Sequence, residues 1–142
     1  MILFAANLGA PVTGAGFQTA ATVPIPAGML LEGVLRWAIS ARHTTGAGTC
    51  QQRLRIGGVD LIAFNPTDGS ANIFTRGAAS APPGDPANLR ANAMSSRGTT
   101  QATGSAAVDL TLAHDLTFEI DLSADTDVYT YDELTVEHLP PT

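Results

Sequence analysis

The chain of 142 residues has no lysine, a single cysteine and few charges, at 14% of residues. An ordinary soluble domain carries about 25% charged residues, so much of this surface must consist of small polar and apolar side chains. Only Cys50 carries a thiol, which excludes a disulfide within the chain. We interpret Cys50 as a small strand residue, because no motif places a histidine beside it.

Basic charge is also scarce, and the net charge is −6. Nine of the thirteen acidic residues lie between Asp109 and Glu137, whereas all seven arginines lie between Arg36 and Arg97. This balance argues against a nucleic-acid partner, which would require neutralisation of phosphates. In an oligomer, the acidic part of one copy could face the arginine-bearing part of another.

Long hydrophobic runs are absent as well. No window approaches the roughly 18 apolar residues of a membrane helix. The apolar start MILFAANLGAPV has no basic residue and is too short for a signal sequence. We therefore expect a protein made in the cytoplasm, with no membrane partner.

Hydrophobic residues alternate with polar ones over most of the chain, and glycine or proline interrupts the alternation every 8 to 15 residues. A period of two is typical of half-buried strands. The predicted strands are residues 2–6, 17–23, 33–42, 51–56, 59–64, 71–76, 93–102 (the weakest), 107–112, 116–122 and 128–138.

The clearest turn is the dipeptide Gly57-Gly58 in LRIGGVDLI. Glycine adopts the positive φ angles of a two-residue type I′ turn without a steric penalty. The predicted pairs are Ile56 with Val59, Arg55 with Asp60 and Leu54 with Leu61.

In the strand 33–42, the odd positions form an apolar face that includes Trp37, which we place in the core. The segments 107–112 and 116–122 are predicted to form an antiparallel hairpin. In the last strand the apolar positions change phase, so we expect a bulge near Asp132 and Glu133.

Three stretches are predicted to be loops. The longest is Gly77–Asn92, which contains three prolines and almost no large apolar residue, with a short helical turn possible at residues 86–91. Residues 8–16 and 43–49 are the other two.

About eight to ten short strands with no room for crossover helices predict one antiparallel β-sandwich domain spanning residues 1–142. A jelly roll is the favoured arrangement, because it combines this number of strands with long connections. The alternative is an immunoglobulin-like sandwich, which the lack of a Cys–Trp–Cys pattern disfavours.

No motif for catalysis or for a cofactor emerges. The fragments GAG at residues 14–16 and 46–48 lack the other parts of a phosphate-binding loop. The histidines His43, His114 and His138 are scattered, and we interpret them as loop or strand-end residues rather than zinc ligands. We predict no catalytic residues, no cofactor and no metal site.

One acidic cluster leaves an alternative open. Asp121, Asp125 and Asp127 are close enough in sequence for a loop to gather oxygen ligands around a cation such as Ca²⁺. We favour instead an acidic β-turn in which Asp125 accepts a hydrogen bond from its own backbone.

Enzyme classes fit poorly. A serine hydrolase lacks the G-x-S-x-G elbow, and a glycosidase needs two carboxylates facing each other in a cleft, whereas Glu119 and Asp121 lie on a polar strand face. Sugar binding without catalysis stays open, although aromatic residues are only 6% of the chain. Tyr129 and Tyr131 share one strand face, where edge packing or subunit contact explains them.

Two segments suggest a family. With its Ala-, Gly- and Thr-rich composition, the lead-in IPAGMLLEG at residues 25–33 and the closing YTYDELTVEHLP at residues 129–140, the chain resembles small accessory virion proteins of tailed bacteriophages. These are jelly-roll modules used as capsid cement or decoration, head fibres or tail-tip parts. The resemblance implies no catalytic residues.

From this we expect a non-enzymatic structural protein of the virion, most simply a capsid cement or decoration protein. We expect it to self-associate and to bind the major capsid protein or another virion protein through loops that include Gly77–Asn92, and the resemblance implies a homotrimer. The alternative is a carbohydrate- or receptor-binding module of a tail or fibre, and a cupin-type enzyme is a third, less favoured class.

Overall fold

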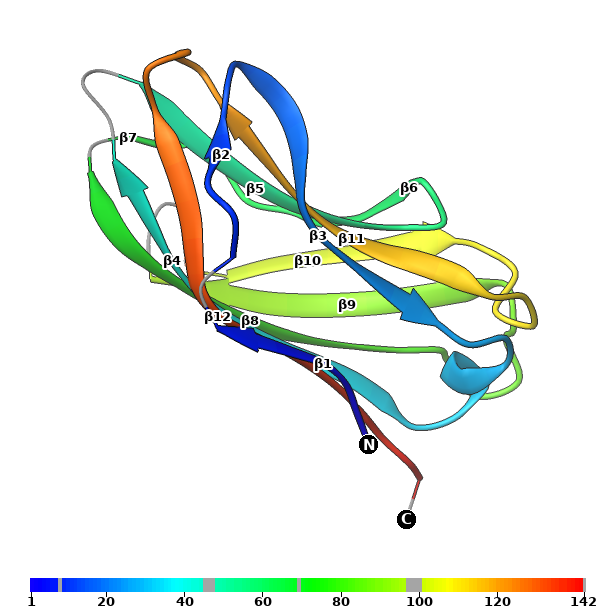
Figure 1. Cartoon of the computed structure of the whole chain (residues 1–142). Coiled ribbons are helices and arrows are strands. Elements are labelled where there is room, and N and C mark those ends of the chain that lie inside the picture. Colours follow the sequence, from blue (N-terminus) through cyan, green and yellow to red (C-terminus); the bar gives the residue numbers. More distant parts are fainter. Residues whose placement is uncertain (8, 45–47, 69, 97–100, 142) are drawn as a thin grey trace.

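Two antiparallel sheets packed face to face make up the computed structural model of the protein (Figure 1). The structure describes residues 1–7, 9–44, 48–68, 70–96 and 101–141. The strands are β1 (Ile2–Asn7), β2 (Val12–Thr13), β3 (Gly16–Ile25), β4 (Val34–Thr44), β5 (Thr49–Ile56), β6 (Val59–Ala63), β7 (Thr67–Asp68), β8 (Ala71–Ser80), β9 (Asn88–Ser95), β10 (Gln101–Ala107), β11 (His114–Leu122) and β12 (Val128–Leu139). A single 3-10 turn, η1 (Met29–Leu31), precedes β4.

The larger sheet has the order β1-β12-β4-β8-β9-β10, with β2 beside β12, and the smaller sheet has the order β3-β11-β5-β6, with β7 beside β5. Along the chain, β1, β4, β8 and β12 of the larger sheet interleave with β3, β5, β6 and β11 of the smaller one. This is the eight-strand connectivity of a jelly roll, with the hairpin β9–β10 added at one edge. The predicted antiparallel β-sandwich is confirmed.

The core lies between the sheets and is filled by alternate residues of each strand. On β4 the predicted apolar face is confirmed, because Leu35, Trp37, Ile39 and Ala41 are all buried. The ring of Trp37 lies directly against the backbone of Gly77 on β8, where an added Cβ would come within 2.3 Å of the ring carbon Cζ2. Glycine at this position therefore makes room for the largest side chain of the core.

The predicted bulge in β12 is confirmed at Asp132. Tyr131 pairs with Ala41 and Glu133 with Ser40, so Asp132 has no partner across this ladder. The extra residue shifts the buried positions from odd to even numbers, as the change of phase indicated.

The Gly57-Gly58 turn is confirmed, with φ angles of 57° and 77°. Two of the three predicted pairs hold, Ile56 with Val59 and Arg55 with Asp60. The third is wrong: Leu54 pairs with Ile62 rather than Leu61, because the register shifts by one residue and both Leu61 and Ile62 are buried.

The predictions for residues 77–102 are largely wrong. The loop Gly77–Asn92 shrinks to residues 81–87, because β8 continues to Ser80 and β9 begins at Asn88, which leaves no helical turn at residues 86–91. The single strand at 93–102 is replaced by the hairpin of β9 and β10, and residues 97–100 between them lie outside the described residues. The inward positions here are mostly alanine, whose weak hydrophobicity concealed the alternation.

The predicted hairpin of 107–112 with 116–122 is also wrong. Residues 108–113 form no strand, although Val108 and Leu110 are buried at one end of the sandwich. Their backbone nitrogens donate to the carbonyls of Ala87 and Pro86 in the neighbouring connection. β11 pairs instead with β3 and β5.

The contact between Trp37 and Gly77 can be tested by substitution. Trp37→Ala should lower the free energy of unfolding by about 3–5 kcal/mol, as expected for a large core residue. Gly77→Ala should lower it by about 1–3 kcal/mol, because the methyl group overlaps the indole ring. Chemical denaturation measures both. Ala78→Ser, at the next position, points outward and serves as the control.

In the double variant the two effects should not add, because removal of the indole makes room for the methyl group. Strict additivity would show that the ring does not pack against Gly77.

Candidate functional site

The outward side chains of the larger sheet form the most distinctive surface of the protein. The register of β12, β4, β8, β9 and β10 arranges them in four rows. We call this surface the outer face. Its first row is Glu133, Ser40, Phe74 and Ser96, and its second row is Thr135, Ala38, Arg76, Met94 and Gln101. Its third row is Glu137, Arg36, Ala78, Asn92 and Thr103, and its fourth row is Leu139, Val34, Ser80, Arg90 and Ser105.

Small residues in the middle of the outer face leave it hollowed. Ala38, Ser40, Ala78 and Ser80 occupy four of the outward positions of the two central strands, β4 and β8. Three adjoining hollows of about 370, 530 and 100 Å³ follow from this. The first two share Ala78 and Asn92, whereas the first and the smallest share Ala38 and Thr135.

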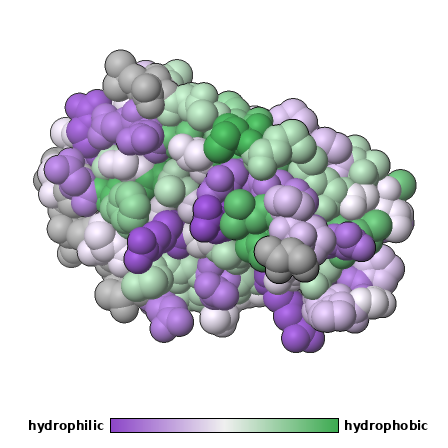
Figure 2. Space-filling view, turned by 90° about the horizontal axis from the view of Figure 1, so that it is seen from below, coloured by the Kyte–Doolittle hydropathy of each residue, from purple (hydrophilic) through white to green (hydrophobic). Residues whose placement is uncertain are grey.

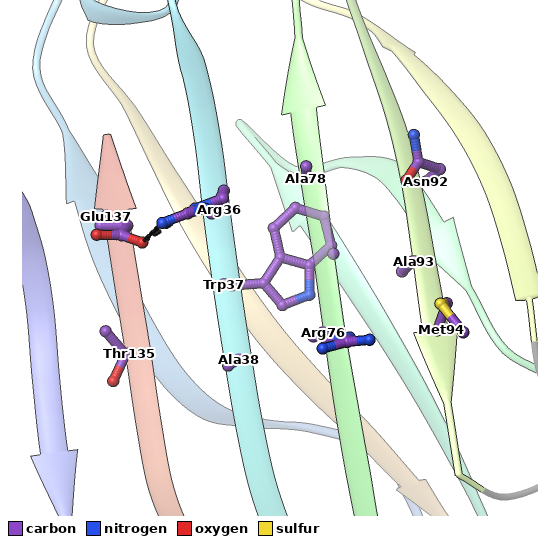
Figure 3. A pocket seen from close by; sticks show the side chains of 11 residues that line it. Arg36, Trp37, Ala38, Arg76, Ala78, Asn92, Ala93, Met94, Thr135 and Glu137 are labelled. Carbon is purple, nitrogen blue, oxygen red and sulfur yellow. Dashed lines mark hydrogen bonds and ion pairs between the residues drawn. The ribbon is translucent and has the colours of Figure 1, made fainter. Parts of the chain in front are cut away.

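The hollow of about 370 Å³ is lined by charged, apolar and small side chains together (Figure 3). Arg36 on β4 and Glu137 on β12 point toward one another at one wall, and Arg36 Nε donates to Glu137 Oε1 at 3.0 Å. Arg76 and Met94 form another wall. Volumes of 300–1,000 Å³ are typical of ligand pockets, but this hollow is open along the sheet.

Two large apolar side chains are exposed on the outer face: Phe74 is 46% exposed and Met94 is 53% exposed. Figure 2, viewed from the side of the larger sheet, shows hydrophobic groups interspersed with hydrophilic ones. Arg76 makes no ion pair with any residue that the structure describes, and the same holds for the exposed Glu133. The outer face thus combines apolar contact area with charges that lack partners in the described chain.

The outer side of the smaller sheet differs, because both of its arginines pair with acidic residues of the chain. Arg53 donates to Glu119 at 2.6 and 2.9 Å and also lies over the ring of Phe17, 3.5 Å from its centroid. Arg55 contacts Asp60 at 2.8 Å. This side has the character of a solvated surface, so the outer face of the larger sheet is the better candidate for binding.

Ion pairs within the chain also use part of the opposite charge in the two parts of the sequence. Arg36 and Arg42 pair with Glu137 and Asp132 of the acidic C-terminal part, as Arg53 does with Glu119. The sequence left open that these charges attract a second copy. In the structure, three of the seven arginines pair in this way with three of the nine acidic residues between Asp109 and Glu137.

A second polar site lies in the interior. His43 on β4 and Asp127 before β12 are both fully buried, and His43 Nε2 lies 3.1 Å from Asp127 Oδ2. Also in the interior, the Tyr129 hydroxyl lies 3.4 Å from Gln52 Oε1. The predicted loop position of His43 is wrong, since β4 extends to Thr44 and buries the ring. A histidine on a strand that continues the Leu35–Ala41 alternation was the signal for this.

The other histidines lie at strand ends. His114 begins β11, with Nε2 2.7 Å from the Asp109 carbonyl oxygen, and His138 lies near the end of β12, with Nε2 2.8 Å from the Glu32 carbonyl oxygen. The three histidines therefore occupy separate places.

The acidic cluster is dispersed as well. Asp121 lies on β11, and Asp127 is bound to His43. Asp125 accepts a hydrogen bond from the backbone nitrogen of Ala15 at 3.1 Å, not from its own segment as predicted. Within the described residues, no three His, Cys, Asp or Glu side chains are placed to share a metal ion.

Cys50 is buried in β5, as predicted for a small strand residue. Burial, followed by the negative charges of Asp127 and Asp121, raises the pKa of its thiol from 9.0 to about 12. A thiol with this pKa carries no negative charge near neutral pH and is a poor nucleophile.

No protein-family model matches the chain, and no curated protein matches its sequence. The part of the chain that the structure describes contains no helix with the length and apolar character required to cross a membrane.

The Cys50 thiol gives a testable pH dependence. Above pH 9.0 the unfolded chain loses the thiol proton, whereas the folded chain retains it to about pH 12, so the free energy of unfolding should fall as pH rises through this window. Burial of the Tyr129 hydroxyl raises its pKa too and acts in the same direction. Urea unfolding at pH 8, 9, 10 and 11 measures the effect.

Cys50→Ala should flatten this dependence relative to the parent chain. If the two proteins lose stability in parallel between pH 9 and 11, the thiol does not keep its proton in the folded state.

Proposed function

We propose that the protein is a non-enzymatic structural component of a virion, which attaches to the protein shell of a tailed bacteriophage as a cement or decoration protein. In this role several copies bind one another and the major capsid protein or another virion protein. The protein is then located on the virion after synthesis in the host cytoplasm.

The observation that supports this proposal best is the outer face. A jelly roll with one hollowed sheet surface that exposes Phe74 and Met94 is suited to broad contact with another protein. The resemblance of residues 25–33 and 129–140 to accessory virion proteins supplies the biological setting. Because the long loop is reduced to residues 81–87, the outer face replaces it as the proposed contact.

Repetition of the same contact on a symmetric particle explains how a weak interface suffices for stable attachment. A symmetric oligomer presents the same face several times to a symmetric particle, so weak contacts act together. The resemblance implies three copies, and closed symmetry of any order has this effect.

A carbohydrate- or receptor-binding module is the second candidate, favoured by the hollows of about 370 and 530 Å³ with their arginine and asparagine side chains. Stacking on sugar rings requires accessible aromatic side chains, however. Among the described residues only Phe17 and Phe74 are exposed aromatics; both lie on strands, and Phe17 is covered by Arg53. Tyr129 and Tyr131, candidates for an edge contact, are buried in the core.

The proposal predicts that the purified protein sediments with particles of its source phage and saturates at a fixed number of copies per capsid. Immunogold labelling of intact virions should place it on the shell. Phe74→Ala together with Met94→Ala should lower the bound fraction about tenfold, as loss of central apolar contacts does in other interfaces. Phe17→Ala on the smaller sheet is the matched control.

Absence of the protein from purified virions, combined with specific signals on a glycan array, would replace this function by the sugar-binding one.

A further inference from the structure

Arg76 and Glu133 form no ion pair with each other or with any other residue in the described part of the chain. Glu133 lies on β12 and Arg76 lies two strands away on β8, one row further along the outer face. With strands about 4.8 Å apart and alternate residues about 6.8 Å apart, their attachment points are about 12 Å apart. The outward residues between them on β4 are Ser40 and Ala38, which are too small to separate two surfaces.

We propose that a second copy of this chain binds face to face on the outer face, around a twofold axis that passes over Ser40 and Ala38. Such an axis exchanges the positions of Glu133 and Arg76. Each Arg76 then meets Glu133 of the other copy, which gives two identical ion pairs from one pair of residues. This inference rests on the self-association that is part of the proposed function and assigns to it the part of the outer face around Ser40 and Ala38. The part on β9 and β10 that carries Asn92, Arg90 and Ser105 stays available to the virion protein.

The same axis places the exposed Phe74 near the centre of the contact. The smallest hollow, about 100 Å³, is lined by Ala38, Ser40, Phe74, Glu133 and Thr135, beside the proposed axis. Rotation about the axis brings Phe74 of the second copy over Ser40 and next to the first Phe74. The two rings fill the shallow centre of the contact, with the ion pairs on either side.

The size of the contact indicates a weak interface. Five strands and four rows of the outer face cover about 24 by 27 Å, or about 650 Å², at standard sheet spacings, and the axis lies near one corner of the face, so the two copies overlap over less than this area. Stable complexes bury about 800 Å² per partner. The outer face also avoids the repulsion between two chains of net charge −6, because its three arginines and two glutamates nearly balance. A trimer that used this contact as well would form a hexamer.

Sedimentation velocity over about 1–200 µM protein tests this contact by charge exchange. The parent chain should show a concentration-dependent dimer or an even multiple. Arg76→Glu and Glu133→Arg should each weaken association about tenfold or more, because each places like charges together. The double variant R76E/E133R should return to within about threefold of the parent, since it restores both ion pairs in reverse.

Matched controls separate this contact from a general effect of charge. Arg55→Glu, Asp60→Arg and their double variant make the same changes on the smaller sheet, where the two residues pair within one chain, and should leave association unchanged. Phe74→Ala should weaken association, and Phe17→Ala should not. Thermal melting confirms that every variant is folded.

A monomeric parent at 200 µM, single variants that associate like the parent, or a double variant that fails to recover would each overturn the proposed contact. Such a protein that still decorates capsids leaves the proposed function standing. A protein that dimerises as described but never binds the virion would overturn the proposed function and leave the proposed contact standing.

Discussion

The two-residue alternation of side chains across a pair of packed sheets is the constraint on which this structure depends. Each strand that passes over the core gives every second residue to the interior, and the remaining residues are free of any packing requirement. The inward set holds nearly all large apolar groups, including Trp37 against Gly77. The chemistry of the surface is therefore determined by the outward residues alone. On the larger sheet these include many alanine, serine and threonine residues, together with charged residues and the exposed Phe74 and Met94.

Prediction from the sequence succeeded wherever one residue type has a strong local preference. Large alternating groups identified the face of β4, paired glycines identified the β5–β6 turn, and a change of phase located the bulge at Asp132. The failures have a common physical cause. Alanine is too weakly hydrophobic to mark the inner face of β9, and the alternation of Val108 and Leu110 describes burial in a connection as well as in a strand. The hollows, and the position of Arg76 without an ion-pair partner among the described residues, depend on register between distant strands, which the sequence did not provide.

The arrangement of charge separates the two outer surfaces of the sandwich. On the smaller sheet each arginine has an acidic neighbour, so nothing is gained by approach of another molecule. On the larger sheet Arg36 is neutralised by Glu137, whereas Arg76 and Glu133 are separated by small residues. An exposed ion pair contributes little to folding, so single charges placed apart cost the fold almost nothing. They remain available to a partner, together with Phe74 and Met94, and make the interface selective as well as adhesive.

The position of β12 has a consequence for how the molecule is made. It is the last strand to be synthesised, yet it lies inside the larger sheet, between β1 and β4, and also holds β2. Among the described strands, β1 has no other neighbour in that sheet. It therefore cannot pair until residues 128–139 have been synthesised. Closure over such long sequence separations is slow, and the waiting strands expose hydrogen-bonding edges meanwhile. A nascent chain of this protein is accordingly vulnerable to aggregation until residues 128–139 have been synthesised and can pair with β1.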